Sequence, residues 1–330
     1  MSDQRVDTAA KSATGLVLGH RRATEALWGV LAILFLAEAL HELFGLGGSG
    51  ADRFFNRGVF NVLIFGSGAI CLLRAATIER LRGAWALIGL SLVSFGIGAV
   101  IWSFHYAEIH PQPFPTASDA FWLAYYAFAI GGLVLLARDR IKGFDLQRWI
   151  DGVAVALIAA TPLVALVLHP MVEEGEHGTT LARILEFAYP VADILLLGGL
   201  LGIFALSGWR PGRTWLLLGA GLVVFGIADS ISAPQFVDGT FEFGTYNYLW
   251  SAGALLISYA AWQPDPPPSR PARLVGWKAI LLPVACQLLA AGIQLYVLFF
   301  AEISESERVI ALLVMALVVV QLWVSRPRAV

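Results

Sequence analysis

About ten stretches of roughly 20 mostly apolar residues run through the sequence, and they constrain the fold more than any other feature. Backbone polar groups inside a lipid bilayer must be hydrogen-bonded within the chain, so such stretches form helices. Of the 330 residues, 58% are hydrophobic and only 14% are charged, whereas soluble domains average about 25% charged residues. We therefore predict an all-α, polytopic integral membrane protein embedded in the lipid bilayer. The predicted spans are residues 25–45, 58–77, 84–104, 119–137, 150–169, 185–207, 214–233, 246–262, 278–300 and 308–325.

The distribution of positive charge predicts the orientation, because cytoplasmic loops of membrane proteins are rich in Lys and Arg. If the N-terminus is inside, the cytoplasmic segments hold all but four of the 22 Lys and Arg residues. The outer segments are acidic instead, as in "MVEEGEHG" and "AEISESER". An even number of spans, ten, keeps this alternation of basic and acidic segments and leaves both termini in the cytoplasm. The net charge of the chain is only −2, which suggests no nucleic-acid partner. The four exceptions are Arg53, Arg57, Arg183 and Arg308.

The composition divides the chain into four parts. Residues 1–23 are a cytoplasmic tail, and residues 24–262 form an eight-helix membrane domain. Residues 263–277 begin with "QPDPPPSRPAR", a Pro-rich, extended cytoplasmic linker. Residues 278–330 form a two-helix hairpin followed by a short basic tail.

An internal repeat relates the third and seventh predicted spans. "WALIGLSLVSFGIGAVI" from Trp85 and "WLLLGAGLVVFGIADSI" from Trp215 are identical at nine of 17 positions, including one Trp, one Phe and two Gly in register. We infer two parallel four-helix units, spans 2–5 and 6–9, an arrangement that some transporters use. Small residues four apart, Gly198 with Gly202 and Ser94 with Gly98, predict close helix packing; a contact between two chains in a homodimer is the alternative.

Three aspartates near the outer ends of spans are candidate ligand-binding residues, since charge within a membrane is costly and often functional. Asp119 follows Thr116 in "TASD", which also fits a helix cap. Asp193 lies beyond Pro190, and Asp229 is expected at the C-terminal end of its span, where a carboxylate opposes the helix dipole. Aromatic side chains crowd the same region. We predict an outer cup, an outward-facing site made of Asp119, Asp193, Asp229, Tyr125 and Trp250.

A second group of polar residues contains histidines. Glu38, His41 and Glu42 share one face of the first span, and His105 and His110 flank the outer end of the third. Imidazole with carboxylate suits zinc, copper or iron, so these five residues are a speculative metal or haem site, although their spacing matches no established motif. Proton sensing by the histidines and an ordinary solvated loop are the alternatives. No cofactor is otherwise implied.

Three stretches carry a family resemblance: "PFPTASDAFWLAYYAFAIGGLVLLARDR", "AYPVADILLLGGLL" and "WLLLGAGLVVFGIADSI". With them, nearly all of residues 25–325 resembles the multi-span N-terminal module of bacterial proteins that carry GGDEF and often EAL domains, the enzymes that make and degrade cyclic-di-GMP. The resemblance implies a bacterial plasma (inner) membrane location, a sensing role and a cytoplasmic signalling domain or protein as partner, possibly of GGDEF/EAL type. This chain has no GGDEF loop, and its two "EAL" strings lie in or beside the first span. We therefore expect no catalysis from it.

Three functions remain open at this point. The first is a non-enzymatic membrane sensor or regulatory module that detects a ligand or protons in the outer cup and passes a helix shift to a cytoplasmic partner. The second is a small-molecule or ion transporter or channel, which the repeat and the predicted spans would suit. The third is a metal- or haem-binding membrane protein that uses the outer histidines.

Overall fold

The computed structural model describes residues 2–109, 112–140, 180–206, 211–237, 241, 244 and 246–264. Within these residues the chain is helical and contains no strand. Three predicted spans, 150–169, 278–300 and 308–325, lie outside them. The long helices are α1 (Ser2–Phe44), α3 (Phe60–Thr77), α4 (Arg82–Ile101), α5 (Ala117–Arg140), α7 (Thr180–Leu206), α8 (Arg213–Val237) and α9 (Asn247–Ala261). The short segments are η1 (Ser49–Ala51), α2 (Asp52–Phe54), η2 (Phe55–Val59) and η3 (Trp102–Tyr106).

The prediction of long apolar helices is confirmed for part of the chain. Among the described residues, five helical segments are long and apolar enough to cross a membrane. The apolar part of α7, Val191–Phe204, is shorter, and α9 has 15 residues, a length of about 22 Å. The five segments are Arg22–Phe44, Ser49–Thr77, Arg82–Tyr106, Ala117–Arg140 and Arg213–Ser232.

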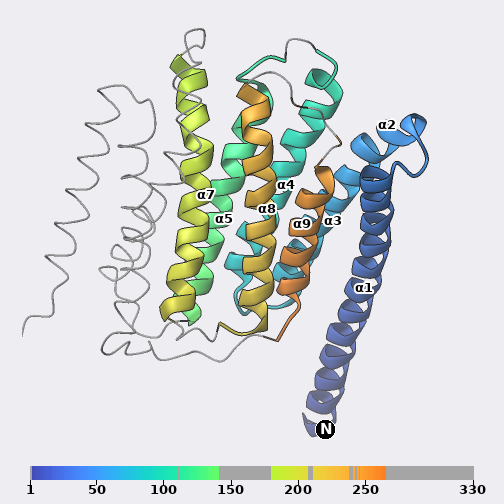
Figure 1. The fold of residues 1–330 in the computed structure, drawn as a ribbon. Coiled ribbons are helices and arrows are strands. Elements are labelled where there is room, and N and C mark those ends of the chain that lie inside the picture. The colour runs from blue at the N-terminus through green and yellow to red at the C-terminus, as the bar shows by residue number, and fades with distance from the viewer. Residues whose placement is uncertain are drawn as a thin grey trace, which may run out of the picture.

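Six helices form a closed ring, with α1 against its outside (Figure 1). In ring order they are α3, α4, α5, α7, α8 and α9, and α9 closes the ring against α3. Among the described long helices, α1 packs mainly against α3 and α9. It presents Val30, Ile33 and Leu36 outward, with exposed fractions of 54%, 70% and 58%. Such an apolar face is expected for a helix that faces lipid.

Aromatic side chains from four helices fill the centre of the ring. The rings of Phe95 on α4 and Phe225 on α8 meet edge to face with their centroids 4.7 Å apart. Tyr125 of α5 stacks on Phe225 at 4.9 Å, and Trp250 of α9 lies 6.1 Å from Phe95. Phe95 and Phe225 occupy the same position in the two similar sequence stretches, so the two stretches contact each other through equivalent residues.

Two glycines let the backbones of α8 and α9 approach each other closely. A Cβ atom at Gly221 of α8 would lie 2.8 Å from the carbonyl oxygen of Gly253 on α9, and a Cβ atom at Gly253 would lie 2.8 Å from the Gly221 oxygen. The packing predicted for Ser94 and Gly98 is also present: the Ser94 hydroxyl donates to the Phe121 carbonyl on α5 at 2.7 Å. In contrast, a Cβ atom at Gly202 would meet no described atom within 4 Å.

A buried arginine holds three helix ends together at one end of the bundle. The Arg74 side chain, on the last turn of α3, is 2% exposed. Its Nε donates to the carbonyl of Ala261 at the end of α9 (3.1 Å), and one terminal nitrogen donates to the carbonyls of Ile78 (3.3 Å) and Arg80 (3.1 Å). Arg80 also pairs with Asp139 of α5 at 3.1 Å. We call this the basic end.

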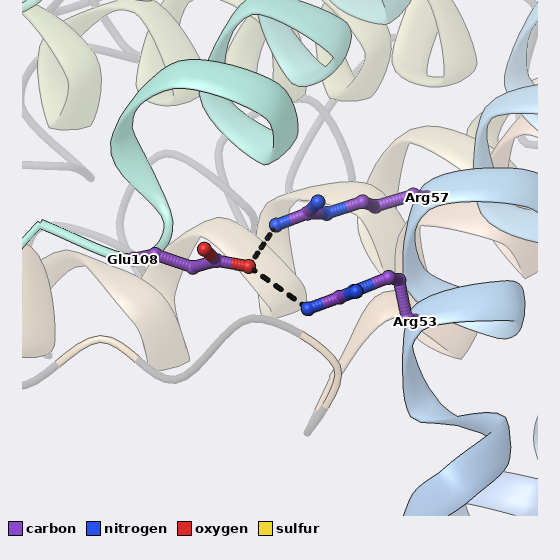
Figure 2. Close-up of polar contacts among 3 residues, drawn as sticks. All are labelled: Arg53, Arg57 and Glu108. Carbon is purple, nitrogen blue, oxygen red and sulfur yellow. Dashed lines mark hydrogen bonds and ion pairs between the residues drawn. The ribbon is translucent and has the colours of Figure 1, made fainter.

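The opposite end holds two of the four Arg residues that depart from the predicted charge distribution. Figure 2 shows Arg53 and Arg57, from α2 and η2, both directed at Glu108 beyond η3. Their terminal nitrogens lie 3.5 Å and 2.5 Å from the same carboxylate oxygen. Arg57 also lies over the Phe104 ring at 5.4 Å. These Arg residues therefore neutralise an acidic side chain of a neighbouring loop.

Candidate functional site

Asp119 both caps its own helix and joins it to a second helix. Its Oδ2 accepts hydrogen bonds from the backbone N–H (2.6 Å) and hydroxyl (2.9 Å) of Thr116, immediately before α5. The cap predicted from "TASD" is thus present, with the carboxylate near the positive end of the helix dipole. The other oxygen, Oδ1, accepts the Tyr189 hydroxyl of α7 at 2.6 Å. Asp119 is 4% exposed.

Asp229 of α8 receives a hydrogen bond from each of two other helices. The Tyr126 hydroxyl of α5 donates to Oδ2 at 3.1 Å, and the Trp250 indole N–H of α9 donates to Oδ1 at 2.8 Å. A single carboxylate thereby links α5, α8 and α9. Because both donors are neutral, neither balances the charge of an ionised Asp229.

Asp193 of α7 completes an acidic pair with Asp229. It interacts electrostatically with Asp229 and is in hydrogen-bonding contact with the Tyr126 hydroxyl. Tyr126 therefore lies between two carboxylates, and Asp193 extends the cluster to a fourth helix. Within the described part of the chain, no Lys, Arg or His contacts either member of this pair.

The remaining members of the predicted outer cup line the same cluster. Tyr125 is 2% exposed, stacks on Phe225 and interacts electrostatically with both aspartates of the pair. Trp250 is 5% exposed. Asp193 and Asp229 keep partial exposure. The structure thus brings Asp193, Asp229, Tyr125 and Trp250 together. Asp119 joins them through Tyr189, whose ring lies 6.2 Å from that of Tyr126.

Two aspartates lie well within their helices. Asp229 is close to the end of the apolar span Arg213–Ser232, as predicted, but α8 continues to Val237, about 12 Å beyond Asp229. The dipole effect falls off within the last turn, so it does not act strongly on Asp229. Helix α7 begins at Thr180 and passes through Pro190. Asp193 is therefore about 20 Å from the start of its helix.

The two tyrosines that connect the aspartates, Tyr126 and Tyr189, are not among the predicted site residues. Tyr189 and Asp193 are four residues apart on α7, and Asp119 and Tyr126 are seven apart on α5. Both spacings place the two side chains on one face of a helix. This helical periodicity could have indicated the tyrosines from the sequence. It does not show that the two helix faces contact each other, because that depends on how α5 packs against α7.

The predicted histidine-containing group is divided between separate contacts. His41 Nδ1 lies 2.8 Å from the Leu46 carbonyl oxygen, and Nε2 lies 3.2 Å from an Asp52 carboxylate oxygen. Glu38 and Glu42 turn instead toward α9. His105 is exposed on η3, and His110 lies outside the described residues. Among the described residues, no three His, Cys, Asp or Glu side chains are grouped as metal ligands.

The bond between Tyr189 and Asp119 gives a direct test of the contact between α5 and α7. We expect Tyr189→Phe to lower the free energy of unfolding by about 1 kcal/mol, the value of one hydrogen bond, since the Thr116 cap stays intact. The measurement is unfolding by sodium dodecyl sulfate of protein purified in detergent. Tyr259→Phe is the matched control, because its hydroxyl makes only an exposed 3.4 Å contact with Arg213. Equal stabilities of the two variants would contradict the assignment.

The arrangement offers proton exchange and recognition of a cationic group. A tyrosine hydroxyl has one hydrogen to donate. When Tyr126 donates to Asp229, its contact with Asp193 is favourable only if Asp193 carries a proton or if a cation lies nearby. Two carboxylates held close together repel each other when both are ionised. Bringing a positive charge between them removes this repulsion.

Comparison with known proteins does not assign the chain to a family. Comparison with family models, with curated proteins and with solved structures finds no match to the chain. Support for a function therefore lies in the aspartate cluster and in the helices that carry it.

Proposed function

We propose that the protein is a non-enzymatic membrane sensor or regulatory module, and that it detects protons at the pair formed by Asp193 and Asp229. One observation carries this proposal: Tyr126 lies between the two carboxylates and has a single hydrogen for them. The groups that face the pair are Tyr125 and Tyr126 of α5, Tyr189 of α7 and Trp250 of α9. All are neutral near pH 7, so none of these four neighbours balances the charge of the pair; the nearest other carboxylate, Asp119, is bonded to Tyr189.

The position of the pair supports transmission of a signal. Asp193, Asp229, Tyr126 and Trp250 belong to four different helices. Gaining or losing a proton changes the repulsion between α7 and α8 and the hydrogen bonds that reach α5 and α9. A ligand shifts a conformational equilibrium only by binding one state more strongly than the other. Here the state with the two carboxylates close together binds the proton more strongly.

The wider context of the proposal follows from the sequence. We propose ten spans with both termini in the cytoplasm of a bacterium, and two parallel four-helix repeats in its plasma membrane. The receiver of the helix shift would be a cytoplasmic domain or protein, possibly of the GGDEF/EAL type. The alternation of helix directions supports this orientation, because it gathers Arg74, Arg80 and Arg213 at the basic end.

The experiment measures movement between α5 and α8 as the pH changes. Spin labels are placed at Arg138→Cys and Leu216→Cys, two exposed positions at the basic end, after Cys71 and Cys286 are replaced by alanine. The full chain is reconstituted in lipid nanodiscs. We expect the distance between labels to change by about 2 Å between pH 8 and pH 5, a typical helix shift, and we expect Asp193→Asn and Asp229→Asn to abolish this change.

The control removes a carboxylate that lies outside the pair. Asp139→Asn breaks only the partly exposed ion pair with Arg80 at the basic end, so it should leave the pH response unchanged. Two results would overturn the proposal: a distance that does not depend on pH in the unsubstituted protein, or a full response that survives in both Asn variants.

Transport is the second candidate, and the acidic character of the pair favours it. A carboxylate within a membrane-spanning helix can relay protons. If the chain transports protons, liposomes that contain it should dissipate an imposed pH gradient, and Asp193→Asn should stop this flux. If the liposomes keep their pH gradient and the spin labels move with pH as described above, the sensor is the better description of the protein.

A further inference from the structure

A second polar cluster lies between α1 and α9, separate from the aspartate pair. Glu38 and Glu42 are four residues apart on α1, and Asn247 and Ser251 are four apart on α9. The two helices run in opposite directions, so the two pairs are in register. Glu42 accepts the Tyr248 backbone N–H at 3.2 Å and contacts the N–H of Asn247. Glu38 faces Ser251.

This cluster is buried, and most of its polar atoms have no hydrogen-bond partner. Glu38, Asn247 and Ser251 are each 0% exposed. Among the described residues, Glu42 Oε1 and both polar side-chain atoms of Asn247 have no partner, and the Glu38 carboxylate and the Ser251 hydroxyl have only each other. Buried polar atoms are normally hydrogen-bonded, so such a concentration points to a further group that they bind.

The charges of the cluster indicate what this group is. Glu42 sits at the first turn of α9, where two backbone N–H groups and the helix dipole compensate its negative charge. The described groups that act on Glu38 are Ser251 and Glu42, and neither is positive. An ionised Glu38 would therefore have no compensating charge among the described residues. A buried carboxyl group either holds a proton or has a positively charged partner, so a group that binds ionised Glu38 carries a positive charge.

The ligand atoms available in this cluster indicate that the bound group is a hard cation. The side chains at this contact of α1 with α9, Glu38, Glu42, Asn247 and Ser251, offer oxygen atoms, and His41 is turned away to Leu46 and Asp52. Hard cations prefer carboxylate, amide and hydroxyl oxygens, whereas zinc and copper prefer nitrogen or sulfur. We propose that Glu38, Glu42, Asn247 and Ser251 form a sodium-binding site that fastens α1 to α9. This proposal does not depend on the proposed function.

The test compares sodium with a cation too large for the site. The thermal midpoint of the purified full chain in detergent is measured at pH 8 in NaCl and in choline chloride at equal ionic strength. We expect the midpoint to rise with Na⁺ concentration and to saturate, since a ligand that binds only the folded state stabilises it. Glu38→Gln should remove the dependence on Na⁺, and Ser251→Ala should raise the apparent Kd at least about tenfold, one lost ligand being worth ~1.4 kcal/mol.

Controls separate this site from the aspartate pair and from a general loss of folding. Glu25→Gln changes an exposed carboxylate on the same helix, and Asp229→Asn changes the other site; both should keep the sodium response. Binding of ²²Na⁺ to unsubstituted protein and to Ser251→Ala provides a second measurement if Glu38→Gln does not fold. The proposal is overturned if Na⁺ and choline give the same midpoint, or if stability responds to pH through Glu38 but not to Na⁺.

Discussion

Replacing Gly221 by valine is expected to separate α8 from α9 and to lower the free energy of unfolding by about 3 kcal/mol. The Cβ atom would lie 2.8 Å from the Gly253 carbonyl oxygen and 3.1 Å from the Ile257 backbone nitrogen. Both contacts are with backbone atoms, which cannot rotate away as a side chain can. The helices must therefore move apart, and the packing around Phe225 and Trp250 loosens with them.

Unfolding by sodium dodecyl sulfate of protein in detergent measures this change. Gly29→Val on α1 is the matched control, because a Cβ atom there meets no described atom within 4 Å. Valine and glycine differ little in helix propensity, so the control should stay within about 0.5 kcal/mol of the unsubstituted protein. A Gly221→Val protein as stable as this control would show that α8 and α9 do not approach closely at this position.

Replacing Arg74 by methionine is the second change with a large expected effect. Methionine keeps much of the buried length but has no donor for the carbonyls of Ala261, Ile78 and Arg80. Hydrogen bonds from a charged donor contribute about 1.5–3 kcal/mol each, and unpaired buried carbonyls add a further penalty. We expect the free energy of unfolding to fall by about 3 kcal/mol or more, and the end of α9 to lose its attachment to α3.

The same unfolding assay tests this prediction, with Arg138→Met as the control. Arg138 is exposed on α5 at the same end of the bundle, so its replacement should change stability by less than about 0.5 kcal/mol. Arg74→Lys should recover part of the loss, since an ammonium group can reach only some of the three carbonyls. If Arg74→Met unfolds like the Arg138 variant, the described hydrogen bonds do not hold the helix ends.

These contacts make α9 the helix on which the proposed sites converge. Its first turn is capped by Glu42 of α1 and bonded to Asp229 through Trp250, and its end is held by Arg74 of α3. A shift that begins at the aspartate pair would therefore reach α9 directly. The sodium proposed near Glu38 would hold the same helix at Asn247 and Ser251, so its removal should make α9 easier to move.

Local patterns in the sequence were sufficient for some elements of the site. The cap at Asp119 was predictable, because a helix cap involves residues three positions apart. The packing of Ser94 and Gly98 followed from their spacing. Asp229 lies near the end of its apolar span, as predicted, but the continuation of α8 beyond that span was not predictable from hydrophobicity. Hydrophobicity marks the part of a helix that suits lipid, and a helix can continue beyond it.

By itself, the sequence determined that the chain forms long apolar helices and which residues share a helical face, because hydrophobicity and helical periodicity are local properties. Only the tertiary structure decided that Tyr126 lies between Asp193 and Asp229, that His41 turns away from Glu38, and that Asn247 and Ser251 face the two glutamates. Each of these contacts joins helices distant in the chain. It depends on the rotation and register of one helix against another, which side chains and glycines across the whole interface set together.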